Sequence, residues 1–508
     1  MLFGAAVAVV LFWMVFILHD LIWVGSIVDD PMWMNLFTPG RPIEWLQWLL
    51  LVPAVVLAGH LAGRLTGGVA RFFLLISFGM ALIFVADASD LRYMLYIEYT
   101  SALLGREFLG VSTWVLTDIG YSILSMLLAV YAVFRYGDYV WPANRAFTYL
   151  LAGFGIYVAT TLLYALRHMD DLYQRIGEQI DAWLLFGRWP ATGAVADDAA
   201  NFSLVDSVIR ETLEVFGAAF FLAMVLAFAA YYRRNDPESI EQSTNPDSAA
   251  SDIWPAIYRL NGLTVFLVVV GLLALSWVGV VLLDLIRVSD SWDRPLWEQL
   301  FHNNRPAEWA QWTLLLVGAV LSAFLSARLS GDPARFFFLM GFGLILIFFE
   351  DTSDLRHTFY REYLSPGLGD TIAGIPTRVI GNSIYFSLIA SIPVYALVRY
   401  GRSVWDSLPT RNFMLAGFGV YAMAGGLSAL SQLGDLYIRL GEVINTRVFA
   451  SRWPWPDTMS EDRAHFYVMD SLVEESIELL GAACLLAMVL SYAWHHRNKT
   501  IRPDDEYR

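Results

Sequence analysis

The residues best suited to carry chemistry are acids that flank or enter long apolar stretches of the chain. Eight of them occur in the first half: Asp20, Glu44, Asp87, Asp90, Asp171, Asp206, Glu211 and Glu214. Adding 264 to each number gives an acid in the second half: Asp284, Glu308, Asp351, Asp354, Asp435, Asp470, Glu475 and Glu478. Carboxylates in such places can bind protons or cations, coordinate a metal ion or pair with arginines.

Spacing indicates where these side chains point. Asp87 and Asp90 are three residues apart, as are Glu211 and Glu214, and residues three apart share one face of a helix. A charged side chain in the hydrocarbon layer of a membrane costs at least about 2.5 to 3.5 kcal/mol. We therefore expect each pair to face the interior of a helical bundle.

The lengths of the apolar stretches predict how deep the acids lie. Residues 72–86 cover about 22 Å of helix before Asp87, and residues 215–231 cover about 26 Å after Glu214, whereas the hydrocarbon layer is about 30 Å thick. Both positions are therefore predicted to lie in the outer third of the membrane.

The second half is richer in possible ligands. Glu350, His357 and Glu474 stand where the first half has Ala86, Tyr93 and Arg210, and we expect Arg210 to neutralise a neighbouring acid. The candidate ion or metal ligands of the second half are Glu308, Glu350, Asp351, Asp354, His357, Asp435, Glu474, Glu475 and Glu478. Their first-half counterparts are Glu44, Asp87, Asp90, Asp171, Glu211 and Glu214. If one site is active, the second is favoured.

The amino-acid composition indicates that the chain lies in a lipid bilayer. Of the 508 residues, 57% are hydrophobic and only 16% are charged, and the mean hydropathy is +0.52. Such a chain suits a lipid bilayer, where helices satisfy their own backbone polar groups. The net charge of -15 argues against nucleic acid as a partner. The single cysteine excludes an internal disulfide and a cysteine-rich metal site.

The offset of 264 extends well beyond the acids. Arg41-Pro42 matches Arg305-Pro306, Arg135-Tyr136-Gly137 matches Arg399-Tyr400-Gly401, and Arg188-Trp189-Pro190 matches Arg452-Trp453-Pro454. Charged residues and prolines that coincide at one fixed offset indicate an internal repeat. We predict a first membrane repeat at 1–232, a polar cytoplasmic linker at 233–255, a second membrane repeat at 256–494 and a cytoplasmic tail at 495–508.

The predicted fold is an all-α polytopic membrane protein with about twelve transmembrane helices in two parallel tandem six-helix repeats. The spans of the first repeat are expected near 2–28, 44–63, 70–90, 111–134, 147–168 and 206–231. Basic residues such as Arg64, Arg135 and Arg233 flank alternate connections, which favours a cytoplasmic location for those ends. An even number of spans in each repeat then gives both repeats one orientation and places both termini in the cytoplasm. We expect a multi-pass protein of the bacterial cytoplasmic (inner) membrane.

Three functions are compatible with this pattern. The first is a cation- or proton-coupled transporter, because acids at membrane depth mark ion pathways and tandem repeats are common in transporters. The second is a membrane metalloprotein or metal-dependent enzyme whose carboxylates and His357 hold a divalent ion. The third is a non-catalytic structural subunit whose acids pair with arginines. The sequence leaves the substrate, the reaction and the oligomeric state open.

Two cofactors are not expected. The eight histidines do not recur at the offset of 264, so no paired axial ligands for haem emerge. Lysine is nearly absent from the predicted spans, which argues against a retinal Schiff base.

Overall fold

The computed structural model divides into two compact units, Met1–Ser251 (unit 1) and Asp252–Arg508 (unit 2). It describes residues 2–16, 19–20, 32–38, 41–89, 91–167, 171–185, 189, 197–235, 261–286, 295–302, 304–353, 360–369, 371–372, 375–431, 435–455 and 459–501.

The described residues contain 11 helices that are long and apolar enough to cross a membrane. A shorter apolar segment, Ala6–Val15, forms most of the first helix, Leu2–Phe16. The chain is therefore an all-α polytopic membrane protein. The first span expected at 2–28 lies partly outside the described residues, which include its portions at 2–16 and 19–20. A total of twelve spans remains a prediction.

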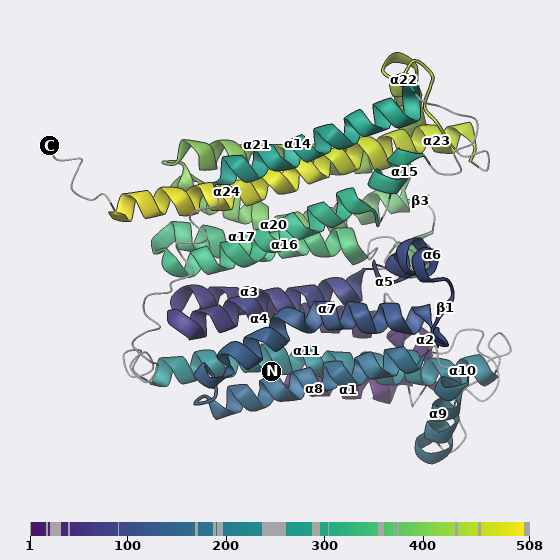
Figure 1. Ribbon diagram of the computed structural model, residues 1–508, viewed down its shortest axis with the longest axis vertical. Helices are drawn as coiled ribbons and strands as arrows, with labels where there is room; N and C mark the ends of the chain where they lie inside the picture. The colour runs from purple at the N-terminus through teal and green to yellow at the C-terminus, as the bar shows by residue number, and fades with distance from the viewer. Residues whose placement is uncertain are drawn as a thin grey trace. The chain divides into compact units, whose positions relative to one another are not determined.

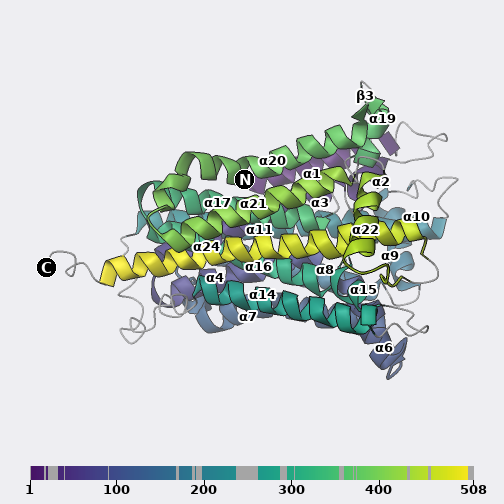
Figure 2. The ribbon, with the colours of Figure 1, turned by 90° about the horizontal axis from the view of Figure 1, so that it is seen from above.

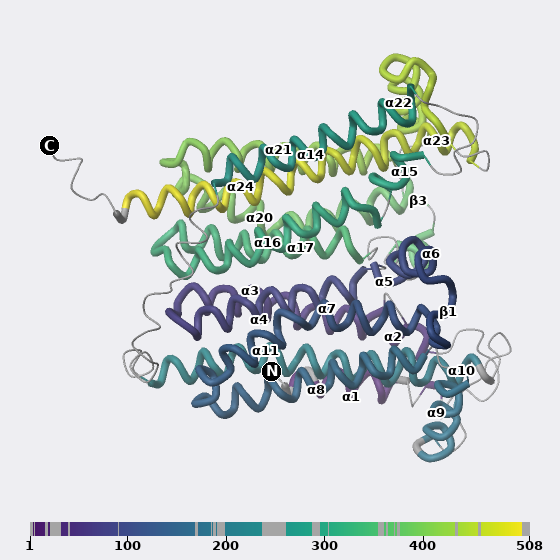
Figure 3. The backbone as a smooth tube through the Cα atoms, viewed as in Figure 1, coloured from purple at the N-terminus to yellow at the C-terminus, as the bar shows by residue number. Residues whose placement is uncertain are grey.

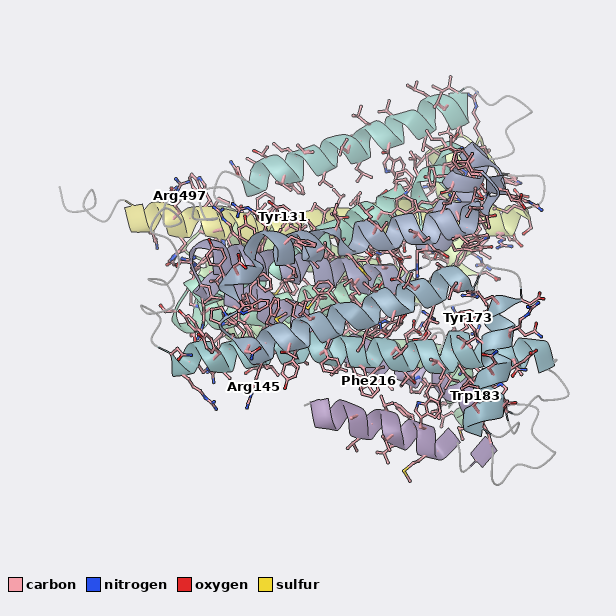
Figure 4. All side chains as sticks on the ribbon, turned by 60° about the horizontal axis from the view of Figure 1, so that its bottom comes forward. Tyr131, Arg145, Tyr173, Trp183, Phe216 and Arg497 are labelled. Atoms are coloured by element: carbon pink, nitrogen blue, oxygen red, sulfur yellow. The ribbon has the colours of Figure 1, made fainter. Side chains whose placement is uncertain are left out.

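In unit 1 the long helices run side by side (Figures 1 and 3). They are α1 (Leu2–Phe16), α3 (Pro42–Arg64), α4 (Gly67–Ala88), α7 (Thr113–Tyr136), α8 (Asn144–Leu166) and α11 (Arg210–Arg234). Shorter elements gather at one end of these helices: α2 (Met32–Phe37), α5 (Leu91–Met94), α6 (Ser101–Leu104), the strands β1 (Glu107–Phe108) and β2 (Val111–Ser112), α9 (Leu172–Ile180) and α10 (Asp197–Ser203). Figure 4 shows Tyr173 and Trp183 at this end and Arg145 toward the opposite one.

The connection between α3 and α4 explains why two acids lie at the same end of unit 1. Helix α3 begins at Pro42, whose fixed φ suits the first position of a helix. Only two residues separate Arg64 at its end from Gly67 at the start of α4, so the two helices are antiparallel neighbours. The start of α3, which carries Glu44, therefore lies beside the end of α4, which carries Asp87.

Unit 2 contains a corresponding series of long helices (Figure 2). They are α14 (Gly262–Val280), α16 (Pro306–Arg328), α17 (Gly331–Ser353), α20 (Thr377–Tyr400), α21 (Leu408–Leu430) and α24 (Glu475–Ile501). The shorter elements are α15 (Leu296–Phe301), α19 (Ser365–Leu368), β3 (Thr371–Ile372), β4 (Ile375–Pro376), α22 (Leu436–Arg447) and α23 (Glu461–Tyr467).

The outer helices expose large apolar side chains, as a bilayer requires. Leu267, Leu272 and Leu275 of α14 are each more than half exposed. In the span Gly262–Ile286, which includes α14, only 11% of the most apolar stretch of 18 residues is buried. In the span Glu461–Lys499, 83% of the equivalent stretch is buried. The last span of unit 2 is therefore an interior helix, and it carries Glu474, Glu475 and Glu478.

Candidate functional site

Unit 1 gathers acids from three helices at one end of its bundle. Glu44 on α3 and both Glu211 and Glu214 on α11 are buried. The indole nitrogen of Trp48 donates a hydrogen bond of 2.9 Å to Asp87 Oδ2. Glu211 interacts electrostatically with Glu44, Asp87 and Glu214. Helices α3, α4 and α11 therefore bring these predicted site residues together.

Arg210 neutralises part of this cluster. Its guanidinium is buried, donates to Glu211 and lies 3.1 Å from Glu214 Oε1. It also donates to the backbone carbonyl oxygen of Asp206 over 2.9 Å. A second cation, Arg167, lies 3.5 Å from an oxygen of Asp206. The expectation that Arg210 pairs with a neighbouring acid is confirmed.

In unit 2 a glutamine connects two acids. Gln311 Nε2 donates to Asp351 Oδ2 and to Glu478 Oε2, each over 3.0 Å. Because both oxygens bond to one nitrogen, they are no more than 6.0 Å apart. Trp312 adds a hydrogen bond of 2.6 Å to Asp351 Oδ2. Two carboxyl groups from different helices thus share one small polar site.

Two more acids extend this site, which we call the unit 2 cluster: Glu308, Asp351, Glu475 and Glu478. The backbone N–H of Asn304 donates to Glu308. Glu475 interacts electrostatically with Glu308, Glu478 and Asp351. Its Oε2 is buried and accepts no hydrogen bond from the described residues. The unit 2 cluster therefore includes a carboxylate oxygen that protein donors leave unsatisfied.

Glu474 occupies the position equivalent to Arg210 but has a different partner. It accepts a hydrogen bond from the hydroxyl of Tyr437 on α22. Burial, followed by the charge of Glu474, raises the pKa of Tyr437, so this hydroxyl keeps its proton. Burial likewise raises the pKa of Tyr173, the counterpart of Tyr437 in unit 1. The residue that supplies a guanidinium in unit 1 thus supplies another carboxylate in unit 2.

The last span of each unit has a π-helical segment immediately before its acid pair. These segments are η5 (Leu204–Ile209), which precedes Glu211, and η10 (Val468–Glu474), which precedes Glu475. Such segments insert an extra residue into a helix and are frequent at functional sites. No feature of the sequence indicated them.

Several predicted site residues lie apart from the clusters or cannot be placed. Asp171 and Asp435 are exposed at the starts of α9 and α22, outside the clusters. Glu350, by contrast, is half-buried at the end of α17 and interacts electrostatically with the neighbouring Asp351 of the unit 2 cluster. Asp90, Asp354 and His357 lie outside the described residues.

Asp20 and Asp284, two of the acids that coincide at the offset of 264, accept hydrogen bonds from backbone N–H groups. Asp20 accepts hydrogen bonds of 2.8 Å from the backbone N–H groups of Met32 and Trp33. Asp284 accepts equivalent bonds of 2.8 and 2.9 Å from Leu296 and Trp297. Each aspartate therefore satisfies the free N–H groups at the start of a short helix, α2 or α15.

A metal centre in the second half was one of the alternatives that the sequence left open. No group of three or more His, Cys, Asp or Glu side chains within the described ranges has an arrangement that could hold a metal ion. Asp354 and His357, on which the predicted metal site depends, are not among these residues.

The chain matches no family model, and comparison with curated proteins and with solved structures gave no match. The functional argument therefore rests on the geometry of the two clusters.

Proposed function

We propose that the protein is an ion-coupled membrane transporter in which the unit 2 cluster binds and releases a proton or a small cation. The observation that carries this proposal is the sharing of Gln311 Nε2 by Asp351 and Glu478. At a separation of 6 Å, two negative charges repel by about 3 kcal/mol at an effective dielectric constant of about 20. A positive charge bound between them relieves this repulsion.

The charges at the start of the last span favour unit 2 as the unit that binds the ion. Asp206, Arg210, Glu211 and Glu214 sum to a formal charge of -2, whereas Asp470, Glu474, Glu475 and Glu478 sum to -4. The acids of unit 1 have a fixed counter-charge in Arg210, which makes them less suited to hold a transported cation. Those of unit 2 have two further negative charges, which suits a transported or coupling cation.

The repeated arrangement of helices favours a transporter over a non-catalytic structural subunit. The helices α3 and α16 both have 23 residues and begin 264 positions apart, as Pro42 and Pro306 do. We infer that the units are tandem repeats of one ancestral bundle, inserted in parallel. Parallel repeats move against each other about a binding site in several transporter architectures. The proposed location is the bacterial cytoplasmic membrane, with both termini and the linker on the cytoplasmic side.

Flux into proteoliposomes tests this function. Purified protein is reconstituted with a pH-sensitive dye in the lumen to report protons, or with a sodium-sensitive dye to report sodium, and a potassium diffusion potential or a sodium gradient is imposed. We expect proton or sodium flux above that of empty liposomes. Glu475→Gln and Glu478→Gln should each lower it about tenfold or more, because each removes a negative charge that attracts the ion, and about 1.4 kcal/mol corresponds to a factor of ten.

Asp332→Asn provides a matched control in the same unit. Asp332 is exposed and forms a surface ion pair of 3.2 Å with Arg335, remote in sequence from the cluster. This variant should retain wild-type flux. Flux that is indifferent to both Glu475→Gln and Glu478→Gln would refute the proposal, and binding of a stoichiometric divalent metal would favour a metalloprotein.

A further inference from the structure

A small cavity in unit 1 lies beside the acids of that unit. Its volume is about 40 Å³, and helices α4, α5, α7, α8 and α11 contribute to its wall. The residues used below are Asp87, Glu214, Ser122, Ser125, Thr160 and Thr161. One water molecule occupies roughly 10 to 15 Å³ of such a volume, so this cavity has room for about three.

The two acids in the wall are close partners. The carboxyl groups of Asp87 and Glu214 line the same small cavity and interact electrostatically. An ionised carboxylate only accepts hydrogen bonds, so a bond between two carboxyl groups requires a proton on one of them. Glu214 is 6% exposed, and its Oε2 accepts no hydrogen bond from the N–H and O–H groups of the described residues. A proton shared by the pair would satisfy that oxygen.

The hydroxyl groups in the wall favour water over an anion. Ser125 donates its own proton to the carbonyl oxygen of Ser122, and Thr160 donates to that of Tyr157, each over 3.0 Å. Their oxygens therefore offer lone pairs to the cavity, where water can donate to them. The neighbouring Arg92 guanidinium, which also lines the cavity, lies 4.2 Å from the centre of the Tyr164 ring. Its positive charge offsets part of the negative charge of Asp87 and Glu214.

We propose that the Asp87–Glu214 pair of unit 1 is a proton-binding site that exchanges its proton with bulk solvent through water in this cavity. When the pair takes up a proton from a hydrated proton in the cavity, one O–H bond forms on a carboxyl oxygen as another breaks, and a water molecule remains. The surrounding titratable and charged groups are Glu44 on α3, Arg92 on α5, Tyr121 on α7, Tyr157 and Tyr164 on α8, and Arg210 and Glu211 on α11.

The second unit lacks the hydroxyl groups that make the cavity polar. The positions 264 residues after Ser122, Ser125, Thr160 and Thr161 hold Phe386, Ile389, Ala424 and Gly425. The proposed proton site is therefore specific to unit 1, and it does not rest on the function proposed for unit 2.

Infrared difference spectroscopy of the full-length protein in lipid tests this site. At neutral pH the wild-type spectrum should contain the C=O stretch of a protonated carboxyl group that Asp87→Asn removes. In D2O this band should shift as the proton exchanges. Ser125→Ile, which fills the cavity with the side chain found in unit 2, should slow the shift about tenfold or more, because it removes water from buried polar groups.

Two further variants keep the test decisive. Thr161→Val removes one hydroxyl with little change of shape and should also slow exchange if Ser125→Ile fails to fold. The control is Ser387→Ile, because Ser387 is exposed on α20 and donates to its own helix at Ser383. This variant should leave the exchange rate unchanged.

Three outcomes would overturn the proposal. They are the absence of a band assignable to Asp87 or Glu214, a band abolished at constant pH when sodium chloride replaces choline chloride, and an exchange rate unaffected by Thr161→Val and by a folded Ser125→Ile. The Glu478→Gln difference spectrum reports on unit 2 separately, so either proposal can fail alone.

Discussion

Removing one of the two carboxyl groups that accept hydrogen bonds from Gln311 should lower the affinity of unit 2 for its proton or cation. In Asp351→Asn the amide occupies nearly the same space, and the hydrogen bond from Gln311 to Glu478 can persist. The variant removes the repulsion between two acids whose bonded oxygens lie at most 6.0 Å apart. At an effective dielectric constant of about 20, that repulsion is about 3 kcal/mol, or about two decades in affinity for a proton or a cation.

The assay is the dependence of proteoliposome flux on the external concentration of the coupling ion. We expect the half-saturating concentration for Asp351→Asn to rise about a hundredfold, while Asp332→Asn keeps the wild-type value. A change of less than about threefold would show that the two carboxyl groups do not act on one ion, and the electrostatic reasoning would be wrong.

Three further predictions concern the stability of the protein. Arg210→Met should lower the free energy of unfolding by about 3 to 5 kcal/mol, because it leaves buried carboxylates without their guanidinium, and adding Glu214→Gln should recover part of this loss in a detergent-denaturation series. Gly441→Ala should lower the melting temperature, because its Cβ would overlap the backbone carbonyl of His465, whereas Gly419→Ala should not, because open space surrounds that position. Burial raises the pKa of Tyr437 above 10.0, so its contribution to stability is complete below pH 10 and is lost as pH rises further, and Tyr437→Phe should flatten this decline in alkaline melting curves.

The meeting of acids from different helices in unit 1 could be predicted from the sequence because it follows from helix length and direction. Glu44 begins one apolar stretch and Asp87 ends the next, so a short connection places them at one end. The role of Arg210 followed from its position one residue before Glu211, within reach of two neighbouring carboxylates. These features depend on distances along the chain, which the sequence states directly.

Lateral packing could not be predicted in the same way. Gln311 connects α16 to both α17 and α24 because those helices pack at particular rotations about their axes, which apolar composition does not specify. The cavity beside Ser125 and Thr160 depends on four long helices at once.

The position of the unit 2 cluster along its helices has a consequence for membrane voltage. From Glu478 to His495, where a basic group begins, α24 advances 17 residues, or about 26 Å of a hydrocarbon layer about 30 Å thick. An ion that reaches the cluster from the nearer surface crosses only about a seventh of the electric field, or about 0.3 kcal/mol per 100 mV. Release toward the farther surface crosses the remainder, about 2 kcal/mol per 100 mV. Loading of the cluster should therefore be nearly independent of membrane potential, and the voltage sensitivity of transport should reside in the release step.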